Sequence, residues 1–289
     1  MDFAAILILQ VLGAIANLIL ICLGLAVIFG MMRIINLAHG EFIMLGAYTA
    51  LVATGHGVNF WIAAFVLAPL VVGGIGLIVE SLVIRHLYGR MIDALLASWG
   101  ISLLFIGLIT VIFGNTTSSQ MAPPFAALRI GDYSIGGYEL FLIAVAALLV
   151  ALLWAALRFT KFGLVARGTL RNPDMAAALG VDPARVYMAT FALGAALSGL
   201  AGALLAPLVA VLPTMGAAFI AKAFITVISG GGAVIAGTVG AATLLGGINS
   251  LASTVATPVI GEVALLVAAI ILLRILPRGL TGRAPGESQ

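Results

Sequence analysis

The sequence predicts an all-α polytopic transmembrane helical bundle, and three observations support this class. About 63% of the 289 residues are hydrophobic and only 8% are charged, whereas soluble domains are about 45 to 50% apolar and 25% charged. The apolar residues form continuous runs, most of them near the roughly 20 residues that one bilayer crossing needs. The runs do not alternate apolar and polar residues at every second position, which excludes a transmembrane β-barrel.

Nine apolar segments are candidates for membrane crossings, and they leave no room for a soluble catalytic domain. We expect about eight or nine of them to cross the bilayer within a single transmembrane domain, 1–289. The segment at 216–230 is the shortest and runs into three glycines, so we expect a crossing with a possible break in its helix. The segments are 3–30, 34–54, 60–84, 94–113, 138–157, 186–208, 216–230, 233–252 and 257–276.

The basic residues predict the orientation. If the N-terminus lies outside and every segment crosses, eleven basic residues fall in the cytoplasm and only Arg129 and Lys222 fall outside. Because cytoplasmic loops carry an excess of Lys and Arg, this distribution indicates an N-out, C-in topology. The eleven are Arg33, Arg85, Arg90, Arg158, Lys161, Arg167, Arg171, Arg185, Arg274, Arg278 and Arg283.

The largest cytoplasmic loop, at 158–185, contains signals for one short helix over 173–179. Asn172 can cap its N-terminus, with Pro173 at the first helical position, and Gly180 provides a stop signal. Asp174 favours the positive end of the helix dipole.

On the cytoplasmic face, such a helix would present Met175, Leu179 and its alanines as a small apolar knob. These facts alone fit an ordinary, well-capped surface helix equally well. Asp182-Pro183 then repeats the cap-and-proline signal and predicts the start of the next membrane helix.

Ionisable side chains inside a membrane span are costly, and the main group of them lies at the cytoplasmic entry of the second segment. In a continuous helix Glu41 would lie about 12 Å past Arg33, well inside the hydrocarbon. The polar residues Asn36, His39, Gly40 and Glu41 instead suggest that the helix starts or breaks here, which in transporters exposes backbone groups to a polar substrate. These four residues are candidates for a translocation pathway or gate. The alternative is a polar knot that ties two helices together.

Small residues recur at four-residue spacing in several segments. Such faces let helix backbones approach closely where lipid provides no hydrophobic drive for association. They are Gly46, Ala50 and Thr54, then Gly194, Ser198 and Gly202, and then Ala236 and Gly240.

The sequence lacks the short motifs of several enzyme classes. It contains no HExxH, GxSxG or GxxxxGK[ST] pattern, and its three histidines stand far apart. We therefore expect no enzyme, no metal site and no cofactor in this chain. If ATP drives it, another subunit must bind the nucleotide.

Five stretches resemble, in order, the LivH-type permease subunits of bacterial branched-chain amino acid ABC importers. Together they cover nearly the whole chain. They are RIINLAHGEFIMLGAY (33–48), RNPDMAAALGVDPARV (171–186), ALSGLAGALLAPL (196–208), GAAFIAKAFITVISGGGAVIAGTVGA (216–241) and LLRILPRGLTGR (272–283).

The resemblance implies that the short helix in the 158–185 loop is the coupling helix that docks into an ATPase subunit. Asp174 to Gly180 keeps the spacing of the EAAxxxG pattern of ABC permeases, with Asp in place of Glu and Met in place of the first Ala. The residues implied in coupling are Arg171, Asn172, Asp174, Met175, Leu179 and Gly180.

The resemblance also implies partners and a location. These are a second, LivM-like permease subunit in a heterodimer, two subunits that bind ATP and Mg, a periplasmic or lipid-anchored substrate-binding protein, and the lipid bilayer of the bacterial inner membrane. No nucleic acid is implied. The implied function is movement of branched-chain or other small amino acids by ATP-driven alternating access.

Alternative functions remain open on the sequence. The stretch LASWGISLL (96–104) also resembles the related urea permease subunits, so urea, short amides or another small organic solute are alternatives, and GGGAV (230–234) stands where GGLGS is typical. A proton-coupled secondary transporter would use His39 and Glu41 as its relay. A purely structural membrane scaffold is a third possibility.

Overall fold

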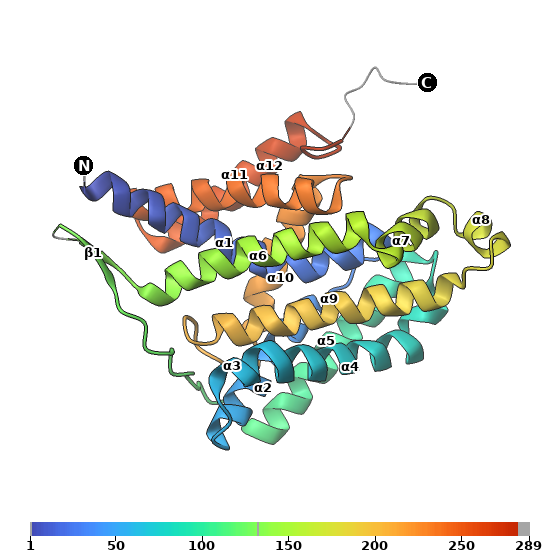
Figure 1. Ribbon diagram of the computed structural model, residues 1–289, viewed down its shortest axis with the longest axis horizontal. Coiled ribbons are helices and arrows are strands. Elements are labelled where there is room, and N and C mark those ends of the chain that lie inside the picture. The colour runs from blue at the N-terminus through green and yellow to red at the C-terminus, as the bar shows by residue number, and fades with distance from the viewer. Residues whose placement is uncertain (1, 132, 283–289) are drawn as a thin grey trace. The chain divides into compact units, whose positions relative to one another are not determined.

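The computed structural model describes residues 2–131 and 133–282 and confirms the all-α polytopic class (Figure 1). Within the described residues, seven helices are long and apolar enough to cross a membrane. Every one of the nine predicted segments is helical. The corresponding elements are α1 (Asp2–Met32), α2 (His39–Gly55), α3 (Phe60–Ile62) with η1 (Ala63–Leu67) and α4 (Ala68–Leu82), α5 (Met91–Phe113), α6 (Gly137–Phe159), α9 (Pro183–Leu205), α10 (Met215–Gly230), α11 (Val234–Val255) and α12 (Pro258–Ile275).

Two of the predicted segments form helices that are shorter than a full crossing. The helix α2 has 17 residues and α10 has 16, so they span about 26 and 24 Å at 1.5 Å per residue, against a hydrocarbon core of about 30 Å. The possible break in 216–230 is absent, because α10 is continuous and its two glycines, Gly216 and Gly230, lie in its first turn and at its last residue. Gly231, with φ of 81°, then takes the chain out of the helix.

The chain divides into two compact units, each built from separate stretches of sequence. Unit 1 comprises Met1–Cys22, Pro123–Ala151 and Lys222–Gln289, and unit 2 comprises Leu23–Ala122 and Leu152–Ala221. The helices α1, α6 and α10 each contribute residues to both units.

In unit 2, α9 packs against both α2 and α4 (Figure 1). The helices approach at small residues: a Cβ at Gly202 would lie 1.8 Å from the Ile43 carbonyl oxygen, and one at Gly46 would lie 2.0 Å from the Gly199 carbonyl oxygen. Gly46, Gly194 and Ser198, predicted to form packing faces, also lie at close contacts. The small-residue spacing in these two segments therefore does reflect helix packing.

The packing around α2 is completed by aromatic rings. The buried Phe42 ring lies 5.9 Å from Phe191 of α9, edge to face, and 6.0 Å from Phe105 of α5. Such pairs add about 0.5–1.5 kcal/mol each beyond their area burial. The start of α2 is thus held between α5 and α9.

Unit 1 contains the packed pair α11 and α12 and a short hairpin. The hairpin joins β1 (Leu128–Ile130) and β2 (Tyr133–Ile135) in antiparallel register, with Arg129 opposite Ser134. It lies in the loop 114–136 between α5 and α6. After α12 the chain returns to the end of α10, where Leu280 N donates to the Ser229 carbonyl at 2.8 Å. Arg283, assigned above to the cytoplasm, lies outside the described residues.

The 158–185 loop of unit 2 holds two helices where the sequence predicted one. Besides α8 (Pro173–Ala178), which ends one residue earlier than predicted, there is α7 (Lys161–Arg171). Thr160 caps α7 by accepting a hydrogen bond from Gly163 N at 3.1 Å. The sequence analysis missed α7 because its two glycines lower the helix propensity of a short segment. Gly163 is needed because a Cβ there would lie 2.2 Å from the Leu157 carbonyl oxygen.

The contact between α2 and α9 gives a stability prediction. We expect Gly202→Ala to lower the free energy of unfolding by about 1–3 kcal/mol, because the added methyl group overlaps the backbone of Ile43. Gly100→Ala in α5 is the matched control: nothing lies within 4 Å of its Cβ position, so Ala should stabilise the helix by roughly 0.5–1 kcal/mol. Unfolding of the purified chain in detergent measures both, and equal effects of the two substitutions would contradict the observed packing.

Candidate functional site

The helix breaks between α1 and α2, as the cluster of polar residues suggested. The helix α1 ends at Met32, and Arg33 has φ of 54°, a left-handed conformation that few residues other than glycine adopt. Residues 34–38 are not helical, and α2 begins at His39. Within unit 2 the chain therefore passes from the end of α1 through irregular backbone before α2 starts.

Polar side chains satisfy this irregular backbone. Leu37 N donates to Ser98 Oγ of α5 at 3.0 Å, and Ala38 N donates to Asn36 Oδ1 at 3.1 Å. Asn36 is almost completely buried. Because an unpaired N–H group in a dry interior is costly, these two hydrogen bonds stabilise the break.

His39 is fully buried and joins α2 to α9. Its Nδ1 lies 3.2 Å from Ser198 Oγ. Since the Ser198 hydroxyl donates to the Gly194 carbonyl at 2.8 Å, its oxygen is left to accept, which assigns the donor role to Nδ1–H of His39. His39 thus has a defined structural contact in the interior of unit 2.

Glu41 is the acidic member of the cluster. Its carboxyl group accepts a hydrogen bond from the Ser102 hydroxyl of α5. Within the described residues, its buried Oε2 and the buried Nδ2 of Asn36 have no hydrogen-bond partner. Buried polar groups are almost always paired, so an unpaired acceptor and an unpaired donor in one short segment call for an explanation. They are one unpaired acceptor and one unpaired donor.

Gly40 contributes no chemical group, and the structure explains why it is small. A Cβ at Gly40 would lie 2.2 Å from the carbonyl oxygen of Gly216, in the first turn of α10. The same holds in reverse, since a Cβ at Gly216 would lie 2.6 Å from the Gly40 carbonyl carbon. The N-terminal ends of the two short helices therefore meet beside Glu41.

The cluster at the start of α2 is predicted from the sequence, but the serines that complete it are not. Ser98 and Ser102 of α5 were not singled out, and Ser198 was noted only as a small residue. The available signal was a hydroxyl inside an otherwise apolar run. Across the described residues, no group of three or more His, Cys, Asp or Glu side chains could hold a metal ion.

The second predicted region, around α8, has the local geometry expected of it. Asn172 Oδ1 accepts from Met175 N at 2.9 Å, and Gly180 has φ of 85°. Met175 is 59% exposed and Leu179 is 78% exposed, whereas Ala176 faces inward. Arg171 and Asp174 are exposed as well. The apolar knob is therefore present at the surface of unit 2.

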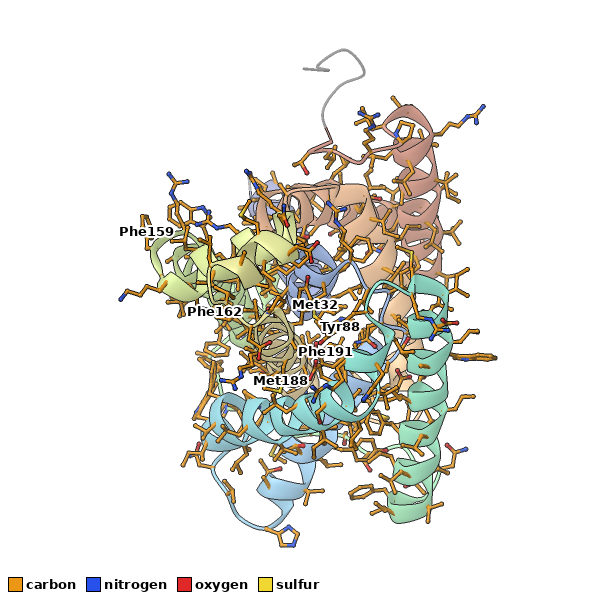
Figure 2. All side chains as sticks on the ribbon, turned by 90° about the vertical axis from the view of Figure 1, so that its right-hand side faces the viewer. Met32, Tyr88, Phe159, Phe162, Met188 and Phe191 are labelled. Atoms are coloured by element: carbon orange, nitrogen blue, oxygen red, sulfur yellow. The ribbon has the colours of Figure 1, made fainter. Side chains whose placement is uncertain are left out.

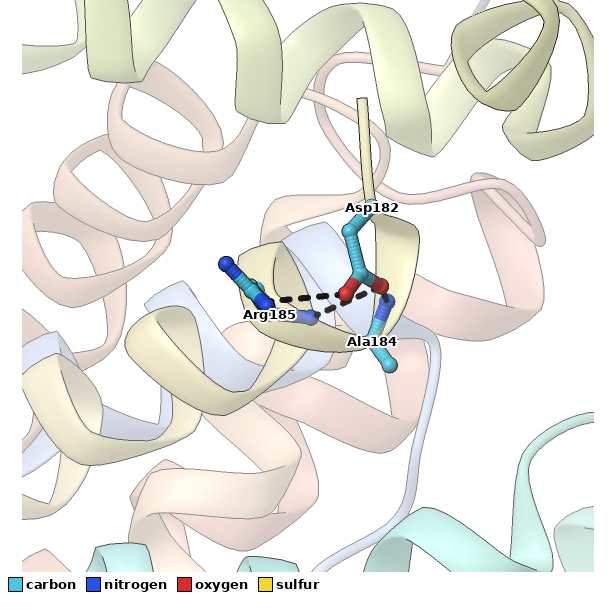
Figure 3. A network of polar contacts seen from close by, with 3 residues as sticks. All are labelled: Asp182, Ala184 and Arg185. Atoms are coloured by element: carbon cyan, nitrogen blue, oxygen red, sulfur yellow. Dashed lines mark hydrogen bonds and ion pairs between the residues drawn. The ribbon is translucent and has the colours of Figure 1, made fainter. Parts of the chain in front are cut away.

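The turn after α8 leads directly into α9. Asp182 caps α9 by accepting from Ala184 N at 3.0 Å and from Arg185 N at 3.4 Å, and it pairs with the Arg185 guanidinium at 3.1 Å (Figure 3). The predicted start of this membrane helix is confirmed.

Several residues assigned to the cytoplasm come together at the end of unit 2 that carries α8. A cavity of about 420 Å³ is lined by Arg33, Arg90 and Pro173, among others. Met32 and Tyr88 line the same cavity and lie next to one another when the molecule is viewed from this end (Figure 2). This gathering agrees with the positive-inside assignment.

Unit 1 has a separate group of polar side chains beside a cavity. Lys222 Nζ lies 2.6 Å from Glu262 Oε1, and Lys222 shares a cavity of about 200 Å³ with Asn17 and Asn249. Neither asparagine was singled out in the sequence.

A comparison with known protein families decides what kind of protein carries these features. The family described as "Branched-chain amino acid transport system / permease component" matches residues 7–276. The chain belongs to this family. Membership makes it a multi-pass membrane permease component rather than an enzyme.

Curated relatives cover nearly the whole chain. The high-affinity branched-chain amino acid transport system permease protein LivH of Salmonella typhimurium is 27% identical, over 93% of this chain and 92% of the relative. The probable branched-chain amino acid transport permease protein LivH of Methanocaldococcus jannaschii is 30% identical, over 92% and 88%. LivM of Salmonella typhimurium is 30% identical over 65% of this chain and 49% of its own length. No solved structure gives a significant match.

The Ser98 hydrogen bond gives a second prediction. We expect Ser98→Ala to lower the free energy of unfolding by about 1–3 kcal/mol, because Leu37 N–H loses its partner. Ser81→Ala in α4 is the control, since within the described residues that hydroxyl bonds only the Ile78 carbonyl of its own helix, and we expect a change within about 0.5 kcal/mol. Detergent unfolding curves of both variants give the comparison. A cost at Ser98 no larger than at Ser81 would show that the serine does not support the break.

Proposed function

We propose that this chain is the transmembrane permease subunit of an ATP-binding-cassette importer that moves branched-chain or other small amino acids by alternating access. The relatives that cover most of the chain are named for branched-chain amino acid transport. In this proposal the chain itself needs no cofactor, and ATP and Mg are held by two partner subunits.

The observation that carries the proposal is the exposed helix α8. It lies outside every candidate membrane span, yet it presents Met175 and Leu179 to solvent next to the charged Arg171 and Asp174. Exposed apolar side chains rimmed by polar ones are typical of a docking surface. An ATPase subunit seated on α8 would push it, and the turn to α9 would carry the movement into the packed helices as a rigid body.

The polar segment before α2 supplies the proposed pathway or gate. Asn36 Nδ2 and Glu41 Oε2 offer a donor and an acceptor at depth, while His39 and Gly40 hold the start of α2 against α9 and α10. Irregular backbone at membrane depth is typical of the places where transporters bind solutes.

The partners and location follow from the same proposal. The partial likeness to LivM supports a heterodimer with a second, LivM-like permease. A periplasmic or lipid-anchored binding protein would deliver the solute, and the assembly would lie in the bacterial inner membrane. Both compact units would then belong to one permease domain, 1–289.

A second candidate solute is urea or a short amide. The unpaired atoms of Asn36 and Glu41 are one donor and one acceptor, a pattern that a neutral amide also matches. A transport assay that compares leucine with urea separates the two.

The docking surface gives a direct test. We expect Met175→Asp to reduce co-purification of the ATPase subunits and ATP-dependent uptake by about tenfold or more, because it places a charge in an apolar contact. Met121→Asp, at an exposed methionine in the 114–136 loop, should leave the ATPase bound. Uptake driven by a proton gradient in vesicles that contain this chain alone would overturn the proposal.

The pathway cluster gives a separate test. Glu41→Ala should lower ATP-dependent uptake about tenfold, because it removes the partner of the buried Ser102 hydroxyl together with the unpaired oxygen. Glu41→Gln should lower it less, because the amide still accepts from Ser102. The pH dependence of uptake should be the same for Glu41→Gln as for the wild-type chain. A pH dependence abolished by Glu41→Gln, together with uptake without ATP, would indicate a proton-coupled transporter instead.

A further inference from the structure

A second cavity of unit 2 lies where α4, the one-turn helix η2 (Ile84–Leu87) and the start of α9 come together. Its volume is about 290 Å³, close to the lower end of the roughly 300–1,000 Å³ of small-molecule sites. It is lined by Glu80, Arg85, Asp182, Ala184, Arg185 and Met188. It is separate from the Asn36–Glu41 cluster and shares no lining residue with it.

The charges of the lining residues sum to zero. Glu80 and Asp182 are acidic, and Arg85 and Arg185 are basic. Asp182 and Arg185 neutralise each other as an ion pair, which leaves Glu80 and Arg85 facing the cavity. A wall with one charge of each sign favours a zwitterion over a simple anion or cation.

Glu80 is the more informative of the two, because it is only 1% exposed. Its Oε1 accepts a hydrogen bond from the Tyr88 hydroxyl. Burial, and then this hydrogen bond, raise the pKa of Tyr88, so the phenol remains a neutral donor. Among the described residues, no ion pair joins Glu80 to Arg85 or Arg185. A buried carboxylate of this kind normally has a charged partner.

A free α-amino acid fits these features. Its ammonium group can donate to Glu80, and its carboxylate can accept from the guanidinium of Arg85, a pairing for which arginine is suited. Met188 provides an apolar contact for the side chain. We propose that this cavity is a regulatory binding site for a zwitterionic amino acid at the end of unit 2 assigned to the cytoplasm.

Binding here would act on α8. The ligand bridges the end of α4 and η2 to the first turn of α9, and that turn follows α8 after only Leu179–Asp182. A bound amino acid stabilises the arrangement in which these elements are close and so resists movement of α8. The accumulated product thereby slows its own import. This inference rests on the proposed function for the identity of the ligand.

Binding of radiolabelled L-leucine to the full chain in lipid nanodiscs, without a binding protein, tests the site. We expect saturable binding that neither 3-methylbutylamine nor 4-methylpentanoate displaces, because each lacks one of the two charges. Glu80→Gln should weaken binding about tenfold or more, since a charged hydrogen bond is lost. Arg85→Gln is a second variant that does not disturb the buried carboxylate, and Glu139→Gln is the control in unit 1.

The regulatory effect is measured in proteoliposomes that contain the assembled transporter. Leucine on the side of the ATPase subunits should lower the initial rate of uptake, and Glu80→Gln should raise the concentration needed about tenfold. No saturable binding, or binding that Asn36→Ala removes and Glu80→Gln and Arg85→Gln leave unchanged, would overturn the inference.

Failure of the inference and failure of the proposed function are distinguishable. If leucine binds at Glu80 but Met175→Asp leaves the ATPase bound, the site stands and the proposed coupling is wrong. If Met175→Asp releases the ATPase but leucine does not bind, only the regulatory site is wrong.

Discussion

The structure depends on the need to pair every backbone polar group inside a membrane. A helix meets this need by itself, so a break in a helix must be supported by side chains. Between α1 and α2 that support is supplied by Asn36 within the break and by Ser98 on α5. These two hydrogen bonds stabilise the non-helical segment that leads into α2, whose start lies between α5 and α9.

The close approach of helix backbones also follows from the membrane environment. Lipid is as apolar as the side chains, so helices gain by contact and not by burial from water. Gly40 against Gly216 and Gly202 against Ile43 bring backbones to distances that no larger residue permits. The first of these contacts places the N-terminal ends of two short helices beside Glu41.

The helical segments could be predicted from the sequence, because a long apolar run inside a membrane can pair its backbone N–H and C=O groups only by forming a helix. The sequence also predicted α8 and its caps, because Asn172, Pro173 and Gly180 act over one turn of chain. The sequence alone did not predict Ser98, Ser102 or Ser198 as partners of the segment that leads into α2. Those contacts join residues about 60 to 160 positions apart, and local sequence patterns do not show which distant residues come together. For the same reason the sequence did not predict the cavity at Glu80, since Asp182 and Arg185 are distant in sequence. The periodicity of apolar residues indicates which face of a helix is apolar, but it does not indicate which other helix packs against that face.

The two polar clusters of unit 2, one around Asn36 and His39 and one around Glu80 and Asp182, differ in the charges that they carry. Around Asn36 and His39 the contacts are mostly between neutral groups, and the acidic Glu41 is bonded to a serine. At the end of α4 and the start of α9, full charges of both signs line one cavity. The free-energy cost of a charge falls steeply from the bilayer centre towards its surface. Full charges of both signs therefore fit the end of unit 2 that the basic residues assign to the cytoplasm. If both proposals hold, a zwitterionic solute contacts mainly hydrogen-bonding groups at Asn36 and Glu41 and charged groups at Glu80 and Arg85.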